Sequence, residues 1–175
     1  HHGDQPVNDN YFPVEDGNPD YNQITQYIEK KRRSEWDIQE DKVIITYNII
    51  DKDITEEKES KLQQIKDIRD ENIYKGININ IDGQTLQFKM DATTIARVDQ
   101  ARLDSKERPT NWKKRWKVDD GVWVELNATQ IEQIRSQGAD HIEACFQKHE
   151  ALENLVNNAQ NVSELNSIDI ESGWP

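Results

Sequence analysis

The stretch Ile77-Asn-Ile-Asn-Ile-Asp-Gly-Gln-Thr-Leu-Gln-Phe-Lys-Met90 decides the fold of this chain. Apolar residues occupy odd positions before Asp82-Gly83 and even positions after it. Asp-Gly is a favoured type I′ turn sequence, and a two-residue turn at this place pairs Ile79 with Leu86. The stretch therefore predicts a β-hairpin with one wholly apolar face.

A second hairpin is predicted in Trp112–Leu126, where the parity of the apolar residues is different. The two apolar sets face each other if the loop has three residues, Asp119-Asp120-Gly121, with Gly121 in the left-handed conformation of a bulge. The facing residues are then Trp112, Trp116 and Val118 on one strand and Val122, Val124 and Leu126 on the other. The same register directs Trp123 away from the apolar face, beside Arg115 and Lys117.

Apolar residues at helical spacing, each series preceded by an N-capping residue, predict four helices after residue 52. The predicted ranges are 54–74, 92–106, 128–159 and a short helix after Asn161, with caps at Asp53, Asp91, Asn127 and Asn161. We expect the longest helix, 128–159, to present one apolar stripe, and Gly138 to weaken it.

The pattern of the N-terminal residues predicts a loop, then a short helix over about 19–32, then a strand over 42–50 that is rich in β-branched residues. Asn18-Pro19 predicts the start of that helix, and the density of apolar residues in the strand predicts burial on part of both faces. We therefore expect an α+β fold with two β-hairpins packed against several helices. The predicted parts are an attachment segment of loop, short helix and strand, 1–52, and a C-terminal α+β domain, 53–175.

The composition excludes several classes of protein. Hydrophobic residues make up 34% of the 175 residues and the formal net charge is −12, so the expected core is thin and general nucleic-acid binding is disfavoured. The single cysteine, Cys145, excludes an internal disulfide framework, and no apolar run is long enough to cross a membrane. We expect no nucleic-acid partner and no membrane contact.

No nucleophile elbow, phosphate loop or zinc-protease motif occurs, and no catalytic acid pair stands out among the many carboxylates. We expect a protein that is not an enzyme and has no cofactor. The weak metal candidate is His141, Cys145 and His149, at helical positions i, i+4 and i+8. Neighbouring members could share an ion, but the outer two are about 12 Å apart along the helix. A buried cysteine flanked by two histidines is the simpler interpretation.

The predicted strand Trp112-Lys-Lys-Arg-Trp-Lys117 interleaves basic and aromatic residues. Such a pattern can bind single-stranded nucleic acid, but strand alternation places Trp112 and Trp116 in the core and the cations outside. Residues 105–117 carry a net charge of +5, whereas 118–175 carry −9. An ion-pair surface within or between subunits explains this asymmetry better.

Two regions resemble known proteins. Tyr11-Phe-Pro-Val-Glu-Asp-Gly-Asn-Pro-Asp-Tyr21, with Ile24 and Tyr27-Ile28, resembles the opening of bacteriophage tail-fibre and tail-assembly proteins. From about Leu62 to Pro175 the chain is similar to an uncharacterised domain at the C-termini of phage tail proteins. The residues that match are Arg69-Asp70, Gly76 to Gly83, Phe88, Asp91, Trp116 to Gly121, Leu165, Ile168-Asp169 and Gly173-Trp174-Pro175. A single glycine, Gly76, stands where the family pattern has a pair.

The resemblance implies a structural adaptor of the phage tail, near the baseplate or tail fibre, that binds other tail proteins. It implies a location in the virion tail after assembly in the host cytoplasm, and it leaves homo-oligomer formation open. The exposed aromatic residues expected at the partner surface are Tyr11, Phe12, Trp123 and Trp174. Two alternatives remain: a tail-fibre assembly chaperone that is not retained in the virion, and a glycan-cleaving tail enzyme.

Overall fold

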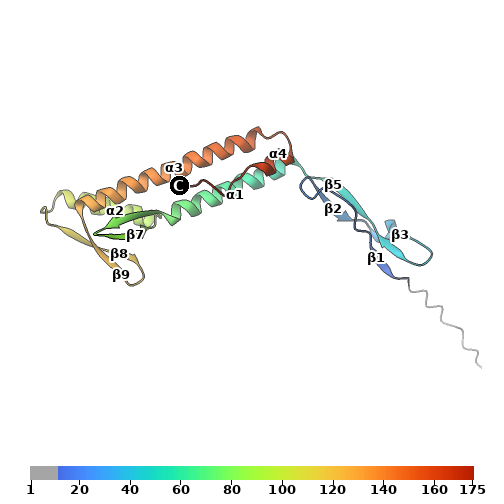
Figure 1. Cartoon of the computed structure of the whole chain (residues 1–175), viewed down its shortest axis with the longest axis horizontal. Coiled ribbons are helices and arrows are strands. Elements are labelled where there is room, and N and C mark those ends of the chain that lie inside the picture. The colour runs from blue at the N-terminus through green and yellow to red at the C-terminus, as the bar shows by residue number, and fades with distance from the viewer. Residues whose placement is uncertain (1–11) are drawn as a thin grey trace, which may run out of the picture.

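A computed structural model describes residues 12–175, which form an elongated molecule with a β-rich segment at one end and a helical body beyond it (Figure 1). In the N-terminal segment the elements are β1 (Val14–Asp16), β2 (Gln26–Lys30), the 3-10 turn η1 (Arg33–Glu35), β3 (Asp37–Ile38), β4 (Val43–Ile45) and β5 (Tyr47–Asp51). The body contains α1 (Ile54–Lys75), β6 (Ile77–Ile81), β7 (Gln84–Phe88), α2 (Ala92–Lys106), β8 (Lys113–Asp119), β9 (Val122–Asn127), α3 (Ala128–Asn158) and α4 (Val162–Ser167). The predicted α+β fold class is confirmed.

The first hairpin, β6–β7, has the predicted register. Ile79 pairs with Leu86 and Ile77 with Phe88. Asp82 and Gly83 both have positive φ angles, 50° and 89°, as a type I′ turn requires. Turn chemistry and face pattern therefore determine this hairpin locally.

The second hairpin, β8–β9, pairs Trp116 with Val124, and Gly121 is left-handed at φ 77°, as predicted. Its loop is tighter than expected, because Asp119 itself pairs with Val122 and the register shifts between Lys117 and Asp119. The extra residue is thus absorbed within the strand as a bulge.

The helices predicted over 54–74, 92–106 and 128–159 are confirmed within one residue at each end, and the short helix predicted after Asn161 is α4. Asp91 and Asn161 accept backbone hydrogen bonds from Thr94 and Glu164, respectively. Asn127 and Gln130 form a reciprocal capping box at the start of α3. Each of these helices therefore begins directly after the residue whose side chain caps it.

Two hydrophobic clusters lie along the helical body. The first, at the hairpin end, contains Ile77, Ile79, Ile81, Phe88, Met90, Val98, Ala101, Trp116, Leu126, Ile131 and Ile134. The second, between α1, α3 and the C-terminal segment, contains Ile65, Leu152, Val156, Ala159, Leu165 and Ile170. α3 joins the two clusters because it contributes buried residues to both, and α1 runs beside it with Ile65 in the second cluster and Ile73 packed against the first.

The predicted N-terminal helix over 19–32 is wrong. β2 occupies Gln26–Lys30 and pairs antiparallel with β5, which places Tyr27 opposite Ile50 and Ile28 opposite Ile49. Asn18 has a positive φ of 32° and lies outside any helix. Pairing with a distant strand outweighs the local helical spacing of the apolar residues, which is a weak signal over so short a stretch.

The predicted strand 42–50 is divided into β4 and β5, which belong to different sheets. β4 pairs parallel with β1 and antiparallel with β3, whereas β5 pairs with β2. None of its residues is buried, so the expected burial on both faces is wrong. The reason is that, within residues 12–175, neither small sheet packs on a second layer.

Candidate interaction surfaces

The N-terminal segment, defined here as Phe12–Lys52, contains no buried residue. Several large apolar side chains in it are exposed, and Ile38 is 72% exposed. The others are Phe12, Val14, Ile24, Tyr27 and Ile49. A β-segment of this size without a core is marginally stable by itself, and such apolar exposure is typical of a surface that another protein covers.

Polar contacts between its strands hold the N-terminal segment together. Tyr47 donates a hydrogen bond from its hydroxyl to Asp16 Oδ2 at 2.9 Å, and this bond raises the pKa of the Tyr47 phenol. Lys42 Nζ lies 3.0 Å from Glu15 Oε2, and the hydrogen bond to this carboxylate raises the pKa of the Lys42 ammonium. These contacts join β1 to the β4–β5 region and leave the apolar side chains free to face outward.

Of the two aromatic residues predicted to bind a partner here, Tyr11 lies outside the described residues. Phe12 precedes β1 and is 41% exposed. The structure thus places Phe12 on the same coreless segment as Ile38.

Trp123 lies on the outer face of β9, as the hairpin register predicts. Its cross-strand partner is Lys117, and its side chain is 50% exposed. The Arg115 guanidinium lies 4.8 Å from the centre of the indole ring, within cation–π distance. The structure therefore brings Trp123 and the basic strand together at the end of the body farthest from the N-terminal segment (Figure 1).

Trp174, the fourth aromatic residue predicted at a partner surface, packs against its own chain. It is half-buried on the second hydrophobic cluster, and its indole N–H donates to the carbonyl of Ile170 at 2.9 Å. The C-terminus is therefore docked on the body, where Trp174 helps to cover the cluster formed by α1, α3 and α4.

Of the three residues of the weak metal candidate, His141 and Cys145 lie beside each other, whereas His149 has a different partner. His141 Nε2 lies 3.0 Å from the Asn72 carbonyl oxygen, and the Cys145 sulfur is 3.8 Å from the same imidazole nitrogen. Cys145 is fully buried, and burial raises the pKa of its thiol. His149 faces Glu153, 3.7 Å away. Within residues 12–175 there is no cluster of three or more metal-binding side chains.

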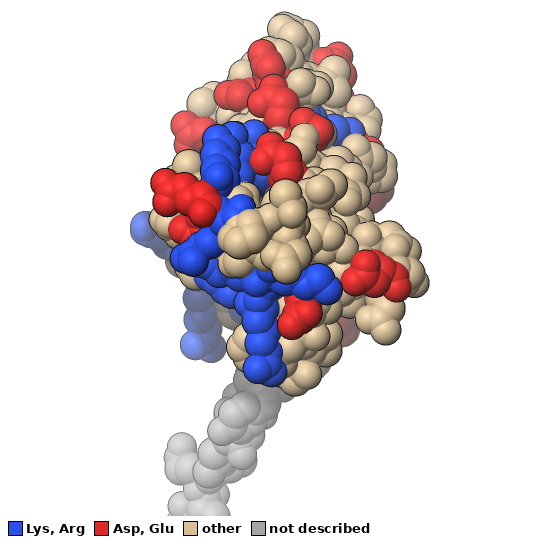
Figure 2. All heavy atoms as spheres, turned by 90° about the vertical axis from the view of Figure 1, so that its left-hand side faces the viewer, with Lys and Arg blue, Asp and Glu red and all other residues tan. Residues whose placement is uncertain are grey.

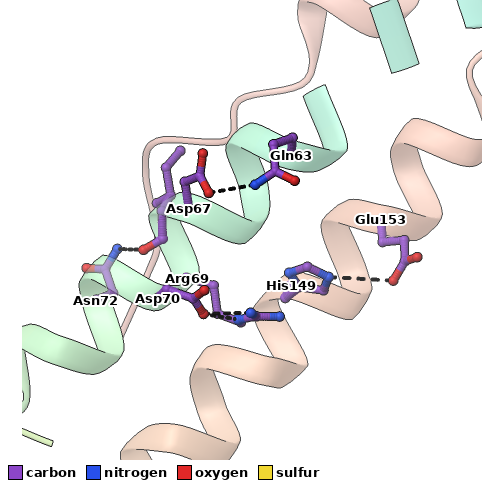
Figure 3. Close-up of polar contacts among 8 residues, drawn as sticks. Gln63, Asp67, Arg69, Asp70, Asn72, His149 and Glu153 are labelled. Atoms are coloured by element: carbon purple, nitrogen blue, oxygen red, sulfur yellow. Dashed lines mark hydrogen bonds and ion pairs between the residues drawn. The ribbon is translucent and has the colours of Figure 1, made fainter. Parts of the chain in front are cut away.

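Figure 3 shows the polar contacts along α1 and α3 around His149. On α1, Gln63 donates to Asp67 at 2.7 Å, and Arg69 binds Asp70 through two nitrogens at 2.6 and 2.8 Å. Arg69 also lies over Phe146 of α3, 4.7 Å from the ring centre. The contacts of Gln63 and Asp70 lie within α1, and the stacking of Arg69 on Phe146 is the one among them that links the two helices.

A small hollow between α2 and α3 was not predicted. Its volume is about 100 Å³, and its lining is Met90, Ile95, Val98, Asp99, Ile134, Arg135, Gly138, Ala139 and Ile142. Gly138 belongs to this site because a β-carbon there would lie 2.4 Å from the Met90 sulfur. A glycine within an otherwise strong helix pattern was the available signal, and it marks a close contact with Met90.

The carboxylates whose pKa is lowered have structural roles. Hydrogen bonds from Thr55 lower the pKa of Asp53 at the start of α1, and those from Ser172 and the backbone lower the pKa of Asp169. The hydrogen bond from Lys117 lowers the pKa of Asp120, and bonds from Gln100 and Lys114 lower that of Asp104. Each shift follows from a cap, a turn or a surface ion pair.

Comparison with known families identifies the helical body. Residues 56–172 match the family described as a domain of unknown function (DUF4376). The chain belongs to this family. The match begins two residues inside α1 and ends after α4, so it includes both hydrophobic clusters and leaves the N-terminal segment outside.

No curated protein and no solved structure matches the chain. In the part of the chain that the structure describes, no helix is long and apolar enough to cross a membrane.

Proposed function

We propose that this protein is a non-enzymatic adaptor of a bacteriophage tail, which joins other tail proteins at the baseplate or tail fibre. The observation that supports a binding role is the N-terminal segment, Phe12–Lys52, which buries none of its side chains within the chain. The tail setting rests on the resemblance of Tyr11–Tyr21 and Leu62–Pro175 to phage tail proteins.

The energetics of the segment favour association. Complete burial of an isoleucine side chain contributes about 1.5–3 kcal/mol, and Ile38 is still 72% exposed. A partner that covers Ile38 and other exposed apolar residues of the segment would therefore supply the hydrophobic burial that this part of the chain lacks. Strand pairing already arranges the segment, so part of the cost of ordering it on binding is removed.

The position of the segment also fits an adaptor. It projects from one end of the molecule, whereas both hydrophobic clusters lie in the helical body (Figure 1). A partner can cover the segment without disturbing those clusters. The body then remains available for a second contact, as a protein that joins two others requires.

The test is incorporation into particles. Full-length protein and the variant Ile38→Asp would be expressed in cells infected with a phage lacking the wild-type gene, and purified particles would be measured by mass spectrometry. We expect wild type at fixed stoichiometry and Ile38→Asp reduced at least tenfold, since a buried charge in an interface is costly. Leu155→Asp is the matched control, because Leu155 is an exposed leucine on α3.

Other outcomes would identify the alternatives. A protein that is absent from mature particles but bound to fibres during assembly would be a chaperone. Hydrolysis of purified peptidoglycan by the wild-type protein would indicate a glycan-cleaving enzyme. Equal incorporation of Ile38→Asp and wild type would contradict attachment through the N-terminal segment.

A further inference from the structure

The outward face of the β8–β9 hairpin forms a second surface, here called the basic hairpin face. Its members are Lys113, Arg115 and Lys117 of β8 and Trp123 and Glu125 of β9. The end-on view in Figure 2 shows basic side chains gathered at this end of the molecule around uncharged surface. This concentration is unusual in the chain, because residues 105–117 carry +5 within a total of −12.

At the centre of this face is the pair formed by Arg115 and Trp123. The guanidinium lies 4.8 Å from the centre of an indole that is 50% exposed. Among the ion pairs within residues 12–175, none involves Arg115. Stacking fixes the plane of the guanidinium, and its hydrogen-bond donors remain available to a carboxylate.

A second pair of an arginine and an exposed aromatic ring, Arg69 with Phe146, provides a comparison for the guanidinium donors of Arg115. Arg69 lies 4.7 Å from the ring centre of Phe146, which is 47% exposed, so the distance and the exposure are close to those of the Arg115–Trp123 pair. The Arg69 guanidinium, however, is already bound to Asp70 at 2.6 Å. Of these two arginine–aromatic pairs, Arg69 has a carboxylate bound to its guanidinium and Arg115 has none among the residues that the structure describes.

Lys113 and Lys117, on the same face as Arg115, form ion pairs that carboxylates of another molecule can replace. Lys117 pairs with Asp120 at 2.6 Å and Lys113 with Glu125 at 3.6 Å, and all four side chains are exposed. Exposed ion pairs contribute only about 0–1 kcal/mol, so carboxylates of another molecule can replace them at little cost.

We propose that the basic hairpin face docks an acidic segment of a partner protein. Carboxylates of that segment bind Arg115 and Lys117, and an apolar or aromatic side chain packs against Trp123. The inference rests on the binding role proposed above and deepens it, because it names the chemistry of the partner at the end opposite the N-terminal segment.

Charge distribution favours an acidic protein segment over nucleic acid. Residues 105–117 carry a net charge of +5, whereas residues 118–175 carry −9. A long polyanion would extend from the hairpin onto this acidic part and be repelled, whereas a short acidic segment can end within the basic region. An exposed tryptophan with an arginine beside it is also the composition of a binding hot spot between proteins.

The experiment measures binding of a fluorescently labelled copolymer of glutamate and tyrosine to the full-length protein by fluorescence anisotropy. We expect binding that weakens with added salt and falls about tenfold in both Trp123→Ala and Arg115→Gln. The matched controls are Phe146→Ala and Arg69→Gln, which remove the same chemistry from α1 and α3 and should bind as wild type. Circular dichroism verifies that each variant is folded.

Three results would overturn the proposal. They are failure of the wild type to bind the copolymer, equal binding by wild type and the hairpin variants, and equal losses in the hairpin and control variants. Heparin and single-stranded DNA are added as competitors at equal charge. If either displaces the copolymer and its binding requires Arg115 and Trp123, the face is a general polyanion site and its assignment to a protein segment is overturned. Because the assay uses purified protein, its outcome is separate from particle incorporation, and Ile38→Asp should bind the copolymer normally.

Discussion

Replacement of Gly76 by alanine should destabilise the protein more than replacement of any turn glycine. Gly76 is the single residue between α1 and β6 and has φ 73° and ψ −150°, a conformation that residues with a side chain rarely adopt. A β-carbon at this position would lie 1.9 Å from the carbonyl oxygen of Phe88. The obstacle is backbone of β7, so relief requires that the hairpin move away from the end of α1.

The loss in the free energy of unfolding expected for Gly76→Ala has two contributions. The backbone conformation costs an alanine about 1–3 kcal/mol, and overpacking against a fixed neighbour adds about 1–3 kcal/mol. We therefore expect Gly76→Ala to lower the free energy of unfolding by about 2–6 kcal/mol. Gly83→Ala is the matched control, because Gly83 also has positive φ, 89°, but a β-carbon there meets nothing within 4 Å. Its expected cost is about 1–2 kcal/mol.

Urea unfolding of the full-length variants, followed by circular dichroism, measures both values. With a urea dependence of about 2 kcal/mol per molar, the difference between the variants corresponds to about 1 M in the midpoint. A loss for Gly76→Ala no larger than that for Gly83→Ala would refute the clash with Phe88. It would show that the junction between α1 and β6 can relax.

Four further predictions concern caps, aromatic residues, acid stability and the thiol. Asn127→Ala should cost about 1 kcal/mol in urea unfolding, because it removes the capping box of α3. Trp174→Ala should cost about 2 kcal/mol and Trp123→Ala less than about 0.5 kcal/mol, and the reverse order would contradict their placement. The pKa of Asp169 is lowered in the folded protein, so its stabilising contribution is present above its unfolded pKa of 3.8 and lost as the pH falls through the folded value. Asp169→Asn should therefore be less stable at neutral pH and lose less stability below pH 3.8 than wild type, as urea unfolding over a pH series can measure. The Cys145 thiol should react with a disulfide reagent far more slowly in the native state than in urea, since it is buried with a raised pKa, and equal rates would contradict that burial.

The parts of the fold that could be predicted are those determined by neighbouring residues. Asp82-Gly83 specifies its turn, and alternation on both sides specifies the register. The side chains of Asp91 and Asn127 each accept a hydrogen bond from the backbone N–H three residues further along the chain, so the starts of α2 and α3 are determined locally as well.

The N-terminal segment could not be predicted because its contacts are distant in sequence. Ile24 and Ile28 are four residues apart, which is compatible with a helix, but Ile28 pairs with Ile49. Tyr47 likewise reaches Asp16 across the segment. The free energy of strand pairing depends on which strand is available, and a local pattern does not contain that information.

The candidate surfaces were predictable in part. The outward position of Trp123 followed from parity along β9, whereas the docking of Trp174 depends on how α4 and the C-terminus lie against α1 and α3. The stacking of Arg115 on Trp123 required the cross-strand register. The lack of burial in Phe12–Lys52 required knowledge that no second layer covers its sheets.

The shared helix has a mechanical consequence. α3 has 31 residues and so extends about 46 Å, with Ile131 and Ile134 anchored in one hydrophobic cluster and Leu152 and Val156 in the other. A pulling force applied between the two ends of the molecule runs nearly along this helix and loads its contacts with α1 in shear. Many side-chain contacts must then yield together, so the body should resist stretching as one stiff rod, and the N-terminal segment, with no core of its own, should give way first.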